Sequence, residues 1–478
     1  MIESVRTRFA PSPTGDLHLG NLRVAVFNFL FARRHNGAFV VRLEDTDPER
    51  NRPGAEARIL EDLAWAGLDW DEGPDRGGPF RPYRQSERAQ LHRDGALVLL
   101  ERGEAYRCSC SEEVVEAVRT EDRRTPACPG GCRERGMGET PEAMGEYAVR
   151  FKVPDAPVSV KDEVRGDIAF HGRDIGDFII LRADGRATYN FAVVADDVAM
   201  EISHVIRGAG HLSNTPKQAL LFDAIAGRRP RFAHLPTVLS PEGGKLSKRT
   251  GAPGIEELRR EGFHPDSVVN YLSLLGWSPG DDREVLTREE LIGEMDLERA
   301  GASDTAFDPE KMRWLSAQHI ATMPEGELSE AVAPYVDRRR FPELSAAELR
   351  RSVSAIRTRM STFGEINEHL GLIFADAESL EEGRRAIAEE EEGAQDVLGA
   401  VQRTLEGLSE WTTETTAEAV REAGERVGAR GRALFHPVRL AVTGTRKGPE
   451  LGMTLAALGR ERTLALVREA LLRLEPTG

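Results

Sequence analysis

The sequence predicts an open α/β domain with parallel strands, interrupted by an α+β insertion and followed by an all-α half. A strand–loop–helix–strand pattern fills the first 45 residues, and a cysteine-bearing segment with short strand-like runs follows it after residue 100. After residue 320 the chain is rich in Ala, Glu, Leu and Arg, which have high helix propensity. Its 478 residues are enough for about three domains.

The N-terminal elements determine the fold class. Residues 3–11 partly alternate between polar and apolar side chains and predict a strand that leads into a proline-rich loop. Residues 22–34 have the apolar spacing of a largely buried helix, and Asn36-Gly37 ends it. The β-branched run 38–43 predicts a second strand. Such a unit implies parallel strands joined by a right-handed crossover.

The rest of the chain changes character twice. Residues 101–188 contain strand-like runs at 147–153 and 177–181, so we interpret them as an inserted α+β subdomain. The α/β pattern resumes at 188–194. Beyond residue 320, apolar side chains recur within Ala-, Glu- and Arg-rich stretches, which predicts helices.

Composition limits the function. Apolar residues make up 40% and charged residues 30%, as in ordinary globular proteins. The net charge of −16 excludes a general nucleic-acid coat protein, so any nucleic acid must meet a local basic surface. We see neither the roughly 20 consecutive apolar residues of a membrane span nor a secretory signal, and we expect a cytoplasmic protein.

The loop at residues 10–20 and the acidic segment 44–47 follow the two predicted strands. Ligands of open α/β sheets bind outside the carboxyl ends of the strands. His18 can donate to phosphate oxygens, and Gly20 lets a flat ring approach the backbone. A tight loop with a capping histidine is the alternative.

A second glycine-led segment, Gly243-Gly-Lys245-Leu-Ser247-Lys248-Arg249, combines three cations with a hydroxyl. Cations on a mobile loop suit a triphosphate, whose charge shifts as a phosphate bond breaks. Alone, such a segment is more often a solvated basic turn.

Together the two segments resemble the signature motifs of class I aminoacyl-tRNA synthetases. Residues 11–20, Pro-Ser-Pro-Thr-Gly-Asp-Leu-His-Leu-Gly, are close to the form in the glutamyl and glutaminyl branch. Further segments look like that branch, at 42–47, 83–86, 187–192, 204–208, 270–277, 307–314 and 435–444. The resemblance covers essentially the whole chain, which is identified as a member of the bacterial-type glutamyl-tRNA synthetases.

The resemblance assigns a role to each region. It implies a Rossmann-like catalytic domain (1–100 and 189–240), an inserted tRNA acceptor-binding subdomain (101–188), a signature-loop and tRNA stem-contact region (241–320), and a helical anticodon-binding region (321–478). The implied enzyme is a glutamate–tRNA ligase that forms glutamyl-adenylate from L-glutamate and ATP, then transfers glutamate to the terminal ribose of tRNA(Glu). Mg²⁺ should accompany ATP, held largely by phosphates and water. We expect a monomer without membrane contact.

Glutamate has two carboxylates and one ammonium, so its pocket needs cationic side chains and an acid or carbonyl. The resemblance implies that Arg207, with Arg8, binds the carboxylates and that Glu44 meets the ammonium. It adds three further substrate-binding residues, Ala10, Ser12 and Tyr189. Singly, each charged side chain could be an ordinary surface ion pair.

For the chemical step, the resemblance implies catalytic roles for His18, Gly20, Lys245, Ser247, Lys248 and Arg249, with ATP bound by His18, Gly20 and Lys248. One departure from the family pattern lies beside them. After Gly208 the family has an acidic pair before the histidine, whereas this chain has Ala209-Gly210. That change removes carboxylates expected near the ATP ribose.

The cysteines form a third pattern: Cys108, Cys110, Cys128 and Cys132 have the spacing of a tetrahedral zinc-thiolate site. A closed site with four thiolates leaves no position for substrate, so we expect structural Zn²⁺. Four unrelated buried thiols are the alternative, and Glu134 is a substitute ligand if only three converge.

In the helical half, Arg357 and Arg359 lie two positions apart, so on a helix they would not share a face. One could serve packing or a phosphate, and the other a base edge. The resemblance implies that Arg359 reads the third anticodon base, although a surface salt bridge is the alternative.

Three other functions compete. They are a small-acid adenylating ligase, a truncated paralogue that modifies a tRNA base, and a non-catalytic tRNA-binding protein. The first two would lack the helical half.

Overall fold

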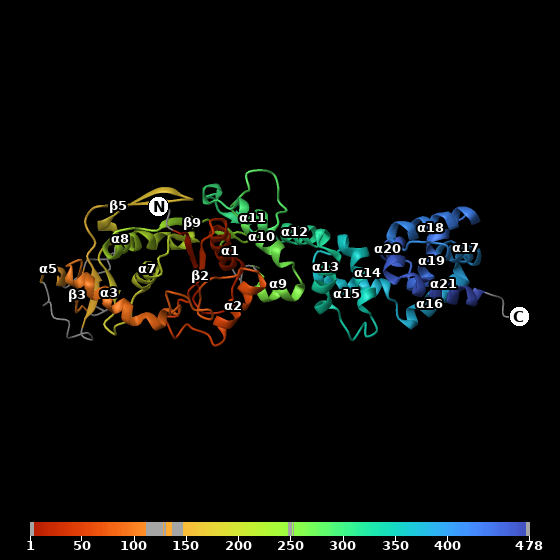
Figure 1. Cartoon of the computed structure of the whole chain (residues 1–478), viewed down its shortest axis with the longest axis horizontal. Helices are drawn as coiled ribbons and strands as arrows, with labels where there is room; N and C mark the ends of the chain where they lie inside the picture. The colour runs from red at the N-terminus through yellow and green to blue at the C-terminus, as the bar shows by residue number, and fades with distance from the viewer. Residues whose placement is uncertain are drawn as a thin grey trace. The chain divides into compact units, whose positions relative to one another are not determined.

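The computed structural model describes residues 4–110, 128, 131–135, 147–246, 251 and 253–474. The chain divides into two compact units, Met1–Glu257 with Val268–Pro309, and Leu258–Ser267 with Glu310–Gly478. Every described strand belongs to the first unit, and the second is helical (Figure 1). The predicted order of an α/β domain before an all-α half is confirmed. None of the described helices is long and apolar enough to cross a membrane.

The predicted strand–helix–strand unit is present at the N-terminus. Strand β1 (Arg6–Phe9) leads through the proline-rich loop into α1 (Leu19–Arg34), and β2 (Ala38–Val41) pairs with β1 in parallel. Helix α1 is apolar around most of its surface and largely buried. The connection between the two parallel strands therefore contains a helix that packs against both of them.

A second parallel pair continues this arrangement. Strands β8 (His204–Gly208) and β9 (Arg231–Leu235) pair in parallel, and β8 lies beside β1, where Ser203 N donates to Arg6 O at 3.0 Å. The carboxyl ends of β1 and β8 thus lie together. The pattern that resumes at residue 188 is helix α7 (Tyr189–Ala199).

The predicted insertion contains two groups of strands. Strands β3 (Ala105–Cys108), β4 (Ala148–Phe151) and β7 (Phe178–Leu181) form an antiparallel sheet. The hairpin β5 (Pro157–Asp162) and β6 (Gly166–His171) instead extends the β8–β9 ladder, in the order β6-β5-β9-β8. The insertion is therefore continuous with the α/β sheet, a contact that sequence periodicity does not reveal.

The first unit contains further helices and strands. They are α2 (Ala55–Trp65), α3 (Ala89–Glu101), α5 (Cys132–Arg135), α6 (Gly172–Ile175), α8 (Thr215–Ala226), β10 (Val238–Leu239), α11 (Arg288–Glu294) and β11 (Thr305–Ala306). Helices α9 (Ile255–Glu261), α10 (Pro265–Leu274) and α12 (Pro309–Thr322) each include residues of both units.

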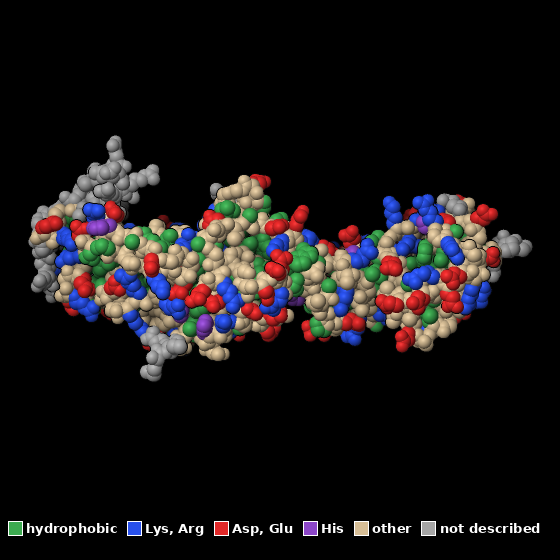
Figure 2. Space-filling view, turned by 90° about the horizontal axis from the view of Figure 1, so that it is seen from above, with side chains coloured by type: hydrophobic (Ala, Val, Ile, Leu, Met, Phe, Trp, Pro, Cys, Tyr) green, Lys and Arg blue, Asp and Glu red, His purple; other side chains and the backbone are tan. Residues whose placement is uncertain are grey.

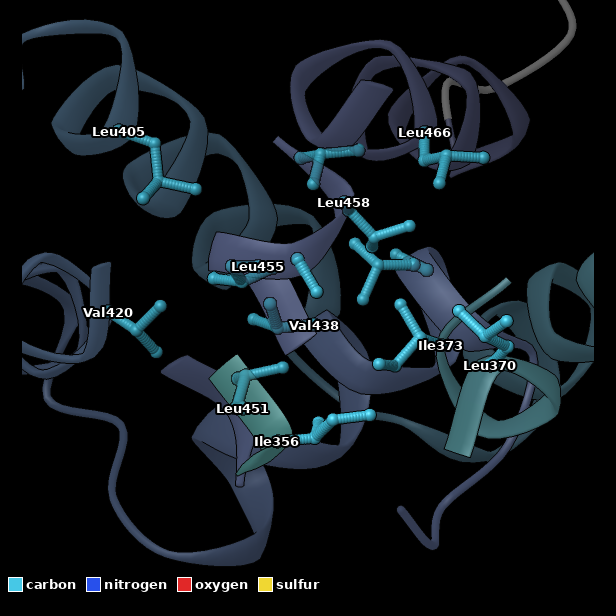
Figure 3. Packing of buried hydrophobic residues seen from close by; sticks show 14 of the residues in the cluster. Ile356, Leu370, Ile373, Leu405, Val420, Val438, Leu451, Leu455, Leu458 and Leu466 are labelled. Atoms are coloured by element: carbon cyan, nitrogen blue, oxygen red, sulfur yellow. The ribbon is translucent and has the colours of Figure 1, made fainter. Parts of the chain in front are cut away.

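The second unit is a bundle of short helices. Its helices are α13 (Glu325–Val332), α14 (Ala346–Ile356), α15 (Ile366–Ile373), α16 (Ala377–Glu390), α17 (Ala394–Glu406), α18 (Thr413–Val427), α19 (Arg432–Thr443), α20 (Leu451–Leu458) and α21 (Arg460–Leu474). Leucine, isoleucine and valine side chains from α14, α15 and α17–α21 meet in one core (Figure 3). Burial of this kind contributes about 25 cal/mol per Å² of apolar surface, which stabilises helices too short to persist alone.

One face of the molecule shows how its surface charges are distributed. On the face seen in Figure 2, basic and acidic side chains are interspersed over each unit. Any basic surface for nucleic acid is therefore local, as the net charge implies. The four-part division with its boundaries stays a prediction.

Candidate active site

A pocket of about 900 Å³ opens at the carboxyl ends of β1 and β8. Seven residues predicted from the sequence line it together: Arg8, Ala10, Ser12, His18, Glu44, Tyr189 and Arg207. A smaller hollow of about 340 Å³ adjoins it and shares Ser12, Glu44 and Tyr189. The position matches the rule that ligands of open α/β sheets bind outside the carboxyl ends of the strands.

His18 and Gly20 form the start of helix α1. The His18 ring caps the helix, because its Nδ1 accepts from Asn21 N at 3.3 Å. A side chain at Gly20 would place its Cβ 3.1 Å from both Nδ1 and Cε1 of that ring. The flat ring that closely approaches Gly20 is thus that of His18 itself. His18 both caps the helix and lines the pocket, so its capping role does not exclude a role in binding.

Glu44 and Arg8 are held by one buried charge network. Arg42, fully buried, donates to Asp197 Oδ1 at 2.6 Å and to Glu44 Oε1 at 3.3 Å. Arg8 Nε donates to both oxygens of Asp197 at 3.2 Å. Burial raises the pKa of Glu44, while Arg42 and Arg8 oppose that shift. The network links Arg8 to Glu44 through Asp197 and Arg42.

Arg207 is buried and held by neutral groups. Its Nε donates to His234 Nε2 at 3.0 Å and its Nη2 to Thr215 Oγ1 at 2.9 Å. Burial lowers the pKa of Arg207 to about 10, so the side chain stays charged at neutral pH. A buried cation with neutral partners keeps its charge available for an anion.

Tyr189 begins helix α7, and its hydroxyl lies 3.0 Å from His211 Nδ1. His211 sits on a 3₁₀ segment, Ala209–Asn214, and also lines the pocket. A Cβ added at Gly210 would meet open space. An acidic side chain at this position, as in the family pattern, would therefore fit this backbone.

The pocket also contains residues that the sequence analysis did not single out. They are Arg50, Arg52, Arg58, His211 and Asn214, among others. Three arginines within nine positions on an acidic chain were a usable signal for an anion site. Partner residues such as His234 and Asp197 gave no local signal, because Asp197 lies 189 positions from Arg8.

The second signature segment is described only in part. Lys245 is exposed and pairs with Leu239 in an isolated antiparallel bridge. Ser247, Lys248 and Arg249 lie outside the described residues. Their predicted roles stay predictions.

The four cysteines converge. Their Sγ atoms all lie within 4.8 Å of one another, with Cys110 and Cys128 3.2 Å apart and Cys108 and Cys128 3.4 Å apart. Tetrahedral Zn–S bonds of about 2.3 Å would need S–S separations of about 3.8 Å, so the cluster fits Zn²⁺ after small shifts. Burial beside other thiols raises the pKa of Cys128 to about 12. A cation would reverse that shift by stabilising thiolates.

The structure corrects the secondary structure expected at Arg357 and Arg359. Helix α14 ends at Ile356, and the two arginines lie on a 3₁₀ turn, Arg357–Arg359. Arg357 Nη2 donates to Met323 O at 2.8 Å, whereas Arg359 is exposed and has no ion-pair partner within the described residues. The helical spacing assumed for the two arginines was therefore wrong, and the roles expected for them stay predictions.

Comparisons with known proteins identify the family. The family model described as "tRNA synthetases class I (E and Q), catalytic domain" matches residues 4–314, and the "Anticodon binding domain" model matches residues 327–471. The chain therefore belongs to the class I tRNA synthetases of the E and Q group.

Individual relatives show to which branch of the E and Q group the chain belongs. The glutamate–tRNA ligase of Desulforudis audaxviator is 43% identical, covering 99% of this chain and 96% of that protein. That of Heliobacterium modesticaldum is 40% identical, covering 98% and 97%. A crystal structure of a glutamate tRNA ligase from Elizabethkingia meningosepticum in complex with its amino acid has a TM-score of 0.80 at 30% identity, covering 99% and 100%. Within the E and Q group, the chain is a member of the glutamate–tRNA ligase family, which confirms the resemblance.

Proposed function

We propose that the protein activates L-glutamate with ATP and transfers it to the 3′-terminal ribose of tRNA(Glu), releasing pyrophosphate and AMP. The observation that carries this proposal is the convergence of Arg8, Glu44, Tyr189 and Arg207 on one pocket beside His18. Arg8 and Arg207 supply two cations for two carboxylates, and Glu44 supplies an acid for an ammonium. We place this activity in the cytoplasm of a monomeric enzyme.

Activation needs positioning and charge stabilisation more than covalent chemistry. The glutamate carboxylate attacks the α-phosphorus of ATP, and pyrophosphate leaves. Because His18 Nδ1 accepts from Asn21 N, the neutral ring carries its proton on Nε2, which is the donor for a phosphate oxygen. Lys245, Ser247, Lys248 and Arg249 are assigned to the triphosphate, and Mg²⁺ would be held by phosphates and water.

Aminoacylation of purified tRNA(Glu) with radiolabelled glutamate tests the function, with glutamine and aspartate as competing substrates. We expect charging with glutamate alone. Glutamine lacks the second carboxylate and aspartate is too short to reach both arginines. Equal charging with glutamine, or none with glutamate, would contradict the proposal.

The helical unit separates this function from two alternatives. A small-acid adenylating ligase and the truncated tRNA-modifying paralogue would each lack it, whereas residues 327–471 match an anticodon-binding model. A non-catalytic tRNA-binding protein would bind tRNA(Glu) in the same assay without charging it.

Lowering the pH is expected to weaken glutamate binding through Glu44. The charged carboxylate binds the ammonium, and burial raises its pKa, so the charged form is lost at higher pH than for an ordinary glutamate. The KM for glutamate should therefore rise between neutral and mildly acidic pH. In Glu44→Gln the KM should be high throughout and nearly independent of pH over this range. A wild-type KM that is flat over the range counts against the assignment.

We expect one structural Zn²⁺ per chain, bound by Cys108, Cys110, Cys128 and Cys132. All four thiols converge, so the substitute ligand Glu134 is not needed. Elemental analysis after zinc-supplemented expression should give a 1:1 ratio, and Cys132→Ser should lower it and reduce the Tm. Wild-type protein without metal would refute the site.

Arg359 is proposed to read the third anticodon base, because an exposed arginine can stack on a base or donate to its edge. Arg359→Gln should reduce the preference for tRNA(Glu) over tRNA(Gln) by about 10-fold, as expected for about 1–3 kcal/mol of base discrimination. The neighbouring Arg357→Gln serves as the matched control for fold, since Arg357 contacts Met323. An unchanged ratio in Arg359→Gln, or equal charging of both tRNAs by wild type, would exclude this role.

A further inference from the structure

The substrate-binding Arg207 rests on a buried chain of hydrogen bonds that begins in the insertion. Arg207 on β8 lies directly opposite His234 on β9 in the parallel register. His234 is completely buried, and its Nδ1 lies 2.5 Å from Asp162 Oδ2. Asp162 is the last residue of β5, in the hairpin that the insertion adds to the sheet.

The Asp162 carboxylate is held in its charged form. Its Oδ1 accepts from the backbone N–H groups of Val164, Arg165 and His234 at 3.0, 2.9 and 3.2 Å. These donors and the His234 ring outweigh burial and lower the pKa of Asp162. An ionised carboxylate accepts only, so the ring nitrogen that faces it must carry a proton.

The tautomer of His234 follows from this contact. With the proton on Nδ1, Nε2 of the neutral ring is an acceptor. That acceptor meets Arg207 Nε at 3.0 Å and lies 3.0 Å from Thr215 Oγ1, which in turn accepts from Arg207 Nη2 at 2.9 Å. Within the described residues Nη1 has no hydrogen-bond partner, and Arg207 lines the pocket. The inner edge of the guanidinium is thus fixed and the outer edge is left for a carboxylate.

The two arginines assigned to glutamate, Arg8 and Arg207, differ in the charge of the groups that hold them. Arg8 is held by the carboxylate of Asp197, which compensates its charge at 3.2 Å. Arg207 is held by a neutral ring and a hydroxyl. The Asp162 charge reaches Arg207 only through the imidazole, so the guanidinium is oriented without being neutralised.

We propose that Asp162 and His234 are positioning residues for glutamate recognition: Asp162 sets the His234 tautomer, and His234 orients the Arg207 guanidinium toward the substrate carboxylate. The proposal rests on the proposed function for the identity of the substrate. It also makes the insertion a direct contributor to the amino-acid pocket, since it supplies Asp162.

Asp162→Asn tests the tautomer. Its amide oxygen is required by the three backbone donors, so its NH₂ group must face His234 Nδ1 and move the ring proton to Nε2. His234 Nε2 then carries a proton and no longer accepts from Arg207 Nε, and the only other acceptor beside it, Thr215 Oγ1 at 3.0 Å, is the one that Arg207 Nη2 uses. We expect the KM for glutamate to rise about 10-fold or more, because small displacements of a positioning group are costly, while the KM for ATP stays within about twofold.

His234→Gln supplies the conservative variant. Its amide can present an oxygen to Arg207 and has no tautomer, so it should retain most of the glutamate affinity that His234→Leu loses. Adding Asp162→Asn to His234→Gln should then cause little further loss, which is a coupling that a purely structural role would not produce. The matched control is Asp177→Asn, a buried carboxylate of the insertion that contacts Tyr106, Val153 and Arg133 and does not line the pocket.

Nitrogen NMR of ¹⁵N-histidine-labelled protein measures the His234 tautomer independently of enzyme activity. The resonance lost in His234→Gln should show an unprotonated Nε2 in wild type and a protonated Nε2 in Asp162→Asn. A protonated Nε2 in wild type, or a switched tautomer with an unchanged KM for glutamate, overturns the proposal. So does additive loss in the double variant. If wild type fails to charge glutamate, the proposed function falls, while the tautomer is still decided by NMR.

Discussion

Arg207→Ala is expected to lower kcat/KM for glutamate by about 10³-fold. Removing one partner of a buried, hydrogen-bonded charge pair costs about 2–5 kcal/mol, and 10³-fold corresponds to about 4 kcal/mol. The loss should fall mainly on the KM for glutamate, because Arg207 faces the amino-acid carboxylate in ground state and transition state alike. Steady-state aminoacylation at varied glutamate concentration measures it.

Arg207→Lys is the companion variant. Lysine keeps the positive charge but cannot reach His234 and Thr215 while also presenting a fork to the carboxylate. We expect an intermediate loss, with the Tm of both variants showing whether the buried site has remained folded. A folded Arg207→Ala enzyme within 10-fold of wild type would remove Arg207 from the glutamate site.

Lys248→Ala is expected to reduce glutamyl-adenylate formation by at least about 10²-fold. A cation aimed at charge that develops in the transition state contributes about 2.7–4 kcal/mol. Single-turnover adenylate formation isolates this step from product release. Lys161→Ala removes an exposed lysine of β5 outside the pocket lining and should leave the rate unchanged. A rate for Lys248→Ala within a few-fold of wild type would remove Lys248 from the chemical step.

The sequence predicted those parts of the site that lie in contiguous motifs. His18 and Gly20 belong to one loop, and Arg8 and Glu44 follow from the strand–helix–strand unit, whose strands end at the same edge. The cysteines were predicted by spacing. In each case a local pattern determines the position, so no long-range contact had to be inferred.

The hydrogen-bond partners that hold these residues in place could not be predicted in the same way. His234 and Asp162 are 72 positions apart and meet only because β5 pairs with β9. Arg42 and Asp197 meet across 155 positions. The end of α14 at Ile356 was missed for a different reason: the helical pattern continues into the 3₁₀ turn that carries Arg359. The pairs Asp162–His234 and Arg42–Asp197 depend on tertiary packing, which the periodicity of the sequence does not encode.

The central claim is that this pocket activates glutamate with ATP. ATP–pyrophosphate exchange tests it most directly, assayed with and without glutamate and with and without tRNA(Glu). We predict exchange that requires glutamate and is strongly stimulated by tRNA, as expected for this family, and that is lost in Arg207→Ala. Exchange that is absent under every condition in folded enzyme with intact tRNA, or that proceeds without glutamate, would contradict the account.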